Sequence, residues 1–111
     1  MSDCHCFNPP FNSQDYDSSP VGIDMTNGRD GEVSLEVCKR CGTHWLHYFV
    51  EYEGFKASGR WFRGIISIEQ ARSMSPEQAV PFLEHLPWYF FGGSYFNSSG
   101  RRGKGAIRAE L

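Results

Sequence analysis

The segment CKRCGTHWLHYFVEYEGF, residues 38–55, begins with two cysteines two residues apart and continues as a run rich in aromatic side chains. Such a composition favours a β-strand, in which successive side chains point to opposite faces. The alternating residues give an apolar face, His44, Leu46, Tyr48, Val50 and Tyr52, and a more mixed face, Trp45, His47, Phe49, Glu51 and Glu53. We expect the apolar face to lie on the core.

The flanking sequence predicts strands on both sides of this segment. VSLEV, residues 33–37, alternates apolar and polar side chains and predicts a half-buried strand that leads into Cys38. KASG, residues 56–59, supplies a turn, and RWFRGIISI, residues 60–68, predicts the return strand. WYFFGGSYF, residues 88–96, is either a further strand or an aromatic loop. These segments indicate a small antiparallel sheet of three to four strands.

Helix signals follow the sheet. Ser67 precedes Gln70 by three residues, and Ser75 precedes Gln78 by three, so each pair is a possible capping box. PEQAVPFLEHL, residues 76–86, has apolar residues at helical spacing and ends before Pro87. The sequence therefore predicts an α+β fold with one or two short helices.

The length of 111 residues indicates a single domain, residues 1–111. Residues 1–32 carry six acidic side chains against Arg29 alone and are rich in Asn, Pro, Ser and Gly, which predicts an extended polar arm. Residues 33–97 contain most of the aromatic side chains and form the expected core of sheet and helix. The sequence of residues 98–111 predicts a flexible basic tail.

The four cysteines form two pairs, Cys4 with Cys6 and Cys38 with Cys41, which are separated by 31 residues. Structural zinc takes four sulfur or nitrogen ligands in tetrahedral geometry. In Cys-x-x-Cys-Gly both sulfurs can converge on one ion, and a glycine at position 42 tolerates the positive φ that such a turn needs. We predict a Zn²⁺ site at Cys4, Cys6, Cys38 and Cys41. Iron, or His5, His44 or His47 in place of one cysteine, remains an alternative.

The strand, CKRCG turn and following strand resemble the knuckle of a zinc ribbon or rubredoxin-like module. The resemblance covers residues 33–68 together with the N-terminal pair, where Cys-x-Cys replaces a second Cys-x-x-Cys-Gly. It implies a zinc knuckle that ties the N-terminal arm to the sheet. Two interpretations without a metal are also possible: four reduced cysteines, and a disulfide between Cys38 and Cys41.

The function expected from this site is that of a small, non-enzymatic zinc-binding protein, with no catalytic residue and no cofactor besides the metal. It would act through a protein partner or as a homodimer, and the candidate contact surface is the aromatic group Trp88, Tyr89, Phe90, Phe91, Tyr95 and Phe96. The N-terminal residues lack the pattern of a secretory signal, and no apolar run is long enough to span a bilayer. We therefore expect a cytoplasmic location and no membrane partner.

Two other classes of function remain open. A nucleic-acid-binding zinc ribbon would use Trp61 for stacking and basic side chains for phosphate contacts, namely Arg60, Arg63, Arg101, Arg102, Lys104 and Arg108. The net charge of −2 provides no overall attraction to a polyanion. A metal enzyme would need an open zinc position and a base such as Glu51, Glu53 or His47, and a thiol enzyme would use Cys38 and Cys41 activated by Lys39 and Arg40.

Overall fold

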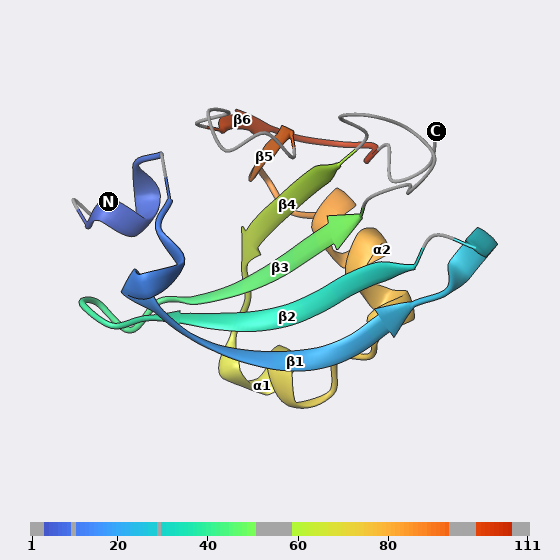
Figure 1. Ribbon diagram of the computed structural model, residues 1–111, viewed down its shortest axis with the longest axis horizontal. Coiled ribbons are helices and arrows are strands. Elements are labelled where there is room, and N and C mark those ends of the chain that lie inside the picture. The colour runs from blue at the N-terminus through green and yellow to red at the C-terminus, as the bar shows by residue number, and fades with distance from the viewer. Residues whose placement is uncertain (1–3, 10, 29, 51–58, 94–99, 108–111) are drawn as a thin grey trace.

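The computed structural model describes residues 4–9, 11–28, 30–50, 59–93 and 100–107. In these ranges six strands form one antiparallel sheet in chain order (Figure 1). The strands are β1 (Tyr16–Asp24), β2 (Gly31–Cys38), β3 (His44–Val50), β4 (Arg60–Ile65), β5 (Tyr89–Gly93) and β6 (Arg101–Gly103). The 3-10 turns are η1 (His5–Phe7), η2 (Ser13–Asp15), η3 (Thr26–Gly28) and η4 (Pro76–Gln78).

An antiparallel sheet with two short helices agrees with the predicted α+β class, but the prediction of three to four strands is too low. Both strands at the edges of the sheet were missed. β1 lies in the expected polar arm and buries only its two end residues, Tyr16 and Asp24, and a bulge interrupts its pairing between Pro20 and Gly22. β6 has no apolar residue. Edge strands pair through the backbone, so they need not carry an apolar alternation.

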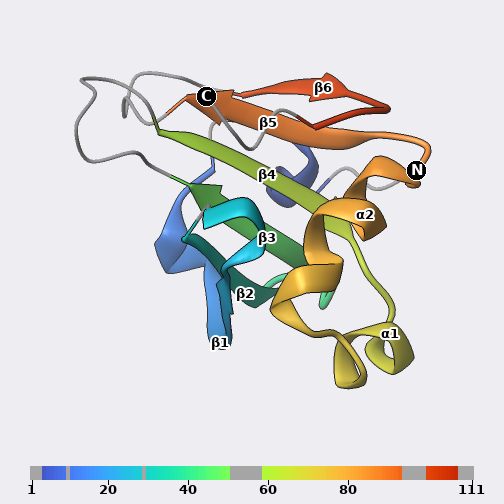
Figure 2. The same ribbon diagram turned by 90° about the vertical axis from the view of Figure 1, so that its right-hand side faces the viewer.

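Two short helices, α1 (Ile68–Arg72) and α2 (Ala79–Glu84), join β4 to β5 and lie on one face of the sheet (Figure 2). The capping box predicted at the first is present, because the Ser67 hydroxyl accepts a hydrogen bond from the Gln70 amide at 3.1 Å and the Gln70 side chain accepts one from the Ser67 amide at 3.1 Å. The Gln78 side chain likewise accepts from the Ser75 amide at 3.2 Å. These local bonds begin α1 and the 3-10 turn η4, which leads into α2 at Ala79, at the two positions that the sequence indicated.

The face of the sheet under α2 carries the larger core. Leu46, Tyr48 and Val50 of β3 are fully buried there, which confirms the predicted inward face within β3; Tyr52 lies outside the described residues. The other buried members of this core are Val33, Phe62, Ile66, Ala79, Val80, Leu83 and Tyr89.

The opposite face of the sheet is also buried, under the N-terminal segment (residues 4–9 and 11–15). Phe7 packs edge-on against Trp45, with ring centroids 5.2 Å apart, and Phe11 packs against Phe90 at 4.9 Å. As a result Trp45, on the mixed face of β3, is 0% exposed. Aromatic burial of this kind gives the segment a docking surface on the sheet, and this docking positions the first two cysteines.

A buried hydrogen bond stabilises the turn between β1 and β2. The Tyr48 hydroxyl donates to Asp24 Oδ2 at 2.7 Å, and the Thr26 amide donates to Asp24 Oδ1 at 3.0 Å. Gly31 lies against the Tyr48 hydroxyl so closely that a Cβ at position 31 would overlap it.

Gly31→Ala is therefore expected to lower the free energy of unfolding by about 1–3 kcal/mol, because the added methyl group must displace Tyr48 from Asp24. Urea denaturation measures the change. Gly93→Ala is the matched control, since among the described residues a Cβ there would meet no atom closer than the Gly59 carbonyl oxygen at 3.9 Å. Equal stability of the two variants would contradict the expectation.

Candidate metal centre

The structure brings the four cysteines together. Their sulfur atoms all lie within 4.8 Å of one another, with Cys4 Sγ 3.6 Å from Cys38 Sγ and Cys6 Sγ 3.5 Å from Cys41 Sγ. All four are free thiols, so Cys38 and Cys41 form no disulfide. Within the described ranges this is the one group of Cys, His, Asp or Glu residues close enough to hold a metal ion.

The turn between β2 and β3 presents Cys38 and Cys41. The Gly42 amide donates to the Cys38 carbonyl at 2.9 Å, and the Cys38 amide donates to the Thr43 carbonyl at 3.0 Å, which closes a tight knuckle. Gly42 has a φ of +78°, and a Cβ there would meet no atom within 4 Å. The glycine is therefore required by the backbone conformation and not by space, as the sequence suggested.

The turn η1 presents the other pair. The Phe7 amide donates to the Cys4 carbonyl at 3.0 Å, and the Asn8 side chain donates to the same oxygen at 3.0 Å. This single 3-10 turn directs Cys4 and Cys6 to the same side. A backbone bond of 3.0 Å from the Lys39 amide to the Asp15 carbonyl joins the end of the N-terminal segment to the knuckle.

The four sulfur atoms differ in exposure. Cys6 is 0% and Cys38 1% exposed, Cys4 is half-buried, and Cys41 is exposed at the tip of the knuckle. The Thr43 hydroxyl, 3.1 Å from Cys41 Sγ, lowers the pKa of Cys41 to about 6, whereas burial raises the pKa of Cys6 well above its usual value. A cation among the sulfurs would allow all four to ionise together.

The three histidines that could have replaced a cysteine lie outside this group of sulfurs. His5 Nε2 is 3.3 Å from the Asp15 carboxylate, and its Nδ1 is 3.8 Å from Cys4 Sγ. His44 and His47 lie on opposite faces of β3, and the ring of His47 stacks on Trp61 with centroids 6.5 Å apart. Glu51 and Glu53, considered as catalytic bases, lie outside the described residues.

A buried ion pair next to the metal centre was missed from the sequence. Arg63 is 3% exposed, and its Nη2 lies 2.8 Å from Glu36 Oε1. Its guanidinium carbon is 4.5 Å from the ring centroid of Phe11, 4.4 Å from that of Tyr16 and 5.1 Å from that of Trp45. In the nucleic-acid alternative, Arg63 was a candidate phosphate contact. Only the register of β2, β3 and β4 reveals Glu36 as its partner.

His47 lies beside this ion pair and faces both Glu36 and Arg63. Burial lowers the pKa of His47 below its usual value of 6.5. A histidine with a lower pKa in the folded than in the unfolded state favours unfolding once the pH falls below the unfolded value. The fold should therefore lose stability as the pH falls through about 6.5.

We expect this acid-dependent loss to be smaller in His47→Gln, by up to about 1.4 kcal/mol for one pH unit below the unfolded pKa. Urea denaturation at neutral and mildly acidic pH measures the difference. His85→Gln removes an exposed histidine by the same change and serves as the control. The expectation fails if His47→Gln retains the pH dependence of the wild type.

The aromatic group at residues 88–96 contributes to the core. Tyr89 and Phe90 are 4% and 1% exposed, and they belong to opposite faces of the sheet. Trp88 and Phe91 are half-buried, and Tyr95 and Phe96 lie outside the described part of the chain. The Arg102 guanidinium covers the Trp88 ring at 4.3 Å.

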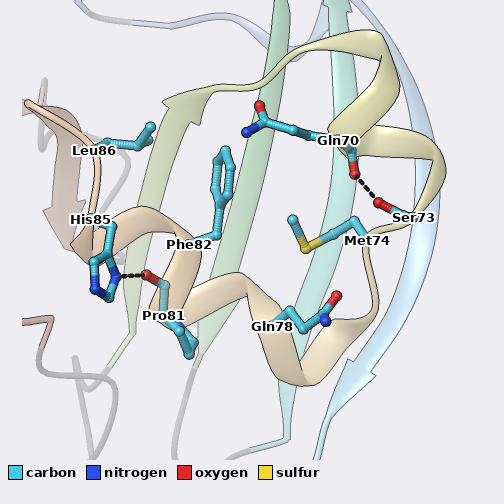
Figure 3. A pocket seen from close by; sticks show the side chains of 8 residues that line it. All are labelled: Gln70, Ser73, Met74, Gln78, Pro81, Phe82, His85 and Leu86. Atoms are coloured by element: carbon cyan, nitrogen blue, oxygen red, sulfur yellow. Dashed lines mark hydrogen bonds between the residues drawn. The ribbon is translucent and has the colours of Figure 1, made fainter.

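A separate groove of about 510 Å³ lies between α1 and α2, on the opposite face of the sheet from the docked N-terminal segment. Figure 3 shows Met74 and Phe82 turned toward the space between the two helices. His85 Nδ1 is held against the Pro81 carbonyl oxygen at 2.7 Å (Figure 3).

No family model matches the chain, and comparison with curated proteins and with solved structures finds no significant similarity. No helix in the described ranges has the length and apolar character needed to cross a membrane. The fold and the site together define an α+β chain whose four cysteines could hold a metal ion.

Proposed function

We propose that this is a small, non-enzymatic zinc-binding protein whose four-cysteine site has a structural role. The observation that carries the proposal is the convergence of Cys4, Cys6, Cys38 and Cys41 Sγ within 4.8 Å. Sulfur ligands favour Zn²⁺ over hard cations such as Mg²⁺ and Ca²⁺, and a set of four cysteines is typical of closed structural zinc sites. Iron is the competing metal, and elemental analysis distinguishes the two.

The structural role is supported by the location of the two cysteine pairs. One pair belongs to the N-terminal segment and the other to the knuckle at the end of β2, so one ion would join them. The same segment carries Phe7 and Phe11, which cover Trp45 and Phe90. Zinc would then stabilise the burial of Trp45 and Phe90 on this face of the sheet, and free thiols of this kind suit a reducing, cytoplasmic location.

The metal content of purified protein tests the ligand set. Wild-type protein is expected to contain one zinc ion per chain, and each of Cys4→Ser, Cys6→Ser, Cys38→Ser and Cys41→Ser is expected to lose stoichiometric zinc. Ser34→Ala, on β2 outside the cluster, is the control. Loss confined to Cys38→Ser and Cys41→Ser would contradict the link to the N-terminal segment.

An enzymatic role makes a different prediction for the exposed ligand. In a zinc-loaded closed site, Cys41 is held by the metal and should react slowly with an alkylating reagent, despite its exposure. Rapid alkylation of native, zinc-loaded protein at Cys41 or Cys38 would favour a reactive dithiol and overturn the structural role.

We further propose that the protein acts through protein contacts. The support is a set of exposed apolar side chains on folded elements, Ile23 at 46%, Met25 at 59%, Ile65 at 38% and Ile68 at 48%. Ile23 and Met25 lie together at the end of β1, where a partner or second copy could cover them. Light scattering over a range of concentrations tests the homodimer, and Ile23→Ser is expected to weaken any dimer found.

A nucleic-acid role has less support from the geometry. Arg63, one of the proposed phosphate contacts, is buried in its ion pair with Glu36, and Arg102 lies against Trp88. Retention on a polyanion column at physiological salt that weakens as salt rises would reverse this order of preference.

A further inference from the structure

A second cavity, of about 740 Å³, lies over β4, β5 and β6 on the same face of the sheet as the helices. Helix α2 packs on β3 and β4, and Figure 2 shows β5 and β6 beyond it. Among the described residues, the segment after β6 lies beside this end of the face, since the Tyr89 hydroxyl donates to the Gly105 carbonyl oxygen at 3.1 Å. The volume falls within the range of sites that take small molecules, about 300–1,000 Å³.

The charge lining this cavity is positive. Arg60, Arg101 and Lys104 belong to it, and none of its described lining residues is acidic. Within the described ranges Arg101 and Lys104 form no ion pair, and both are exposed. The nearby Glu84 carboxylate accepts a hydrogen bond from the Ile107 amide at 2.7 Å.

Arg102 also borders the cavity, but its guanidinium lies on the other face of the sheet. It lies 4.3 Å from the ring centroid of Trp88 and 5.6 Å from that of Phe90. Successive side chains of β6 point to opposite faces of the sheet. Arg101 therefore lies on the cavity side, where it is paired with Phe91.

The floor of the cavity is aromatic. Phe62, Phe91 and Arg101 form one cross-strand row over β4, β5 and β6, with Phe91 half-buried. Gly103 follows on β6, and a Cβ there would lie 2.8 Å from Phe91 Cε1. The absence of a side chain at Gly103 therefore lets the backbone of β6 lie close against the edge of the Phe91 ring.

We infer that this cavity binds a small molecule that carries a phosphate group on a planar apolar body, such as a mononucleotide. The Arg101 guanidinium presents paired N–H donors that match phosphate oxygens, and Lys104 adds a point charge. The Phe91 ring provides a surface on which a planar group can stack. This site is independent of the zinc centre and of the proposed structural role.

Isothermal titration of the zinc-loaded full chain with adenosine monophosphate tests the inference, with adenosine and inorganic phosphate as probes of each half of the ligand. Adenosine monophosphate should bind at one site per chain, and more tightly than either part. Arg101→Ala and Lys104→Ala should each weaken binding by about tenfold or more, as expected for a lost charged hydrogen bond. Arg72→Ala, which removes an exposed positive charge on α1, should leave binding unchanged.

Three results would overturn the inference. The first is no saturable binding of adenosine monophosphate. The second is binding that Arg101→Ala and Lys104→Ala leave unchanged, in variants whose circular dichroism matches the wild type. The third is displacement of adenosine monophosphate by a single-stranded oligothymidylate that binds far more tightly, which would make the cavity part of a nucleic-acid surface.

Discussion

Removal of the zinc ion that we propose for the four-cysteine site is expected to release the N-terminal segment from the sheet while the core under α2 stays folded. Structural zinc contributes on the order of 10–16 kcal/mol of apparent binding free energy in small peptides. A whole domain is stable by only about 5–15 kcal/mol. Loss of the ion would leave the N-terminal segment held by Phe7, Phe11 and a few backbone bonds, against the entropy gained on release.

Hydrogen exchange measured before and after chelation distinguishes the two faces of the sheet. Amides of the N-terminal segment should lose protection, and Trp45, which is buried in the structure, should gain solvent exposure that shifts its fluorescence to longer wavelength. The backbone amides of Leu46 and Tyr48 in β3 and of Phe62 in β4 should remain protected from exchange.

Cys38→Ser provides the control for this experiment. It should reproduce the chelated state without chelator, and added chelator should change it no further. Unchanged protection of the N-terminal segment after complete loss of zinc would show that aromatic packing alone holds the segment, and would refute the structural role of the metal.

Arg63→Ala is expected to lower the free energy of unfolding by about 3–5 kcal/mol, because it leaves a buried carboxylate without its partner. Glu36 is only 12% exposed in its side chain, and the Arg63 guanidinium fills the space among Phe11, Tyr16 and Trp45. The substitution therefore removes a charge and creates a cavity under the N-terminal segment.

A double variant separates these two causes. Arg63→Met with Glu36→Gln removes both charges and retains most of the volume, so it should recover most of the loss, as replacement of a buried pair often does. Arg72→Ala on the exposed surface should change stability by no more than about 0.5 kcal/mol. Urea denaturation measures all three, and an Arg63→Ala loss no larger than that of Arg72→Ala would contradict the buried pair.

Local patterns predicted much of the central structure. The alternation from His44 to Val50 identified the core face of β3, because one strand with one apolar face can bury it in only one orientation. The spacings Ser67 to Gln70 and Ser75 to Gln78 predicted the starts of the helical segments. Gly42 indicated the positive φ of the knuckle. Each of these signals acts within a few residues of the chain.

The edges and the second face of the sheet could not be predicted in this way. β1 and β6 are held by backbone bonds to β2 and β5, and their side chains carry little apolar pattern. The sequence placed only the apolar face of β3 on the core. Trp45 on the mixed face is nevertheless buried, because Phe7 covers it from a distant part of the sequence. Such coverage leaves no signal within β3 itself.

The sequence by itself determined which residues could bind a metal and which segments could form the central strands and helices, because cysteine chemistry and side-chain alternation are local properties. Only the tertiary structure decided that Cys4 and Cys6 meet Cys38 and Cys41, and that Arg63 meets Glu36. Both encounters depend on how the N-terminal segment docks and on the register of β2, β3 and β4. Docking and register minimise the free energy of the whole fold, and no single segment specifies them.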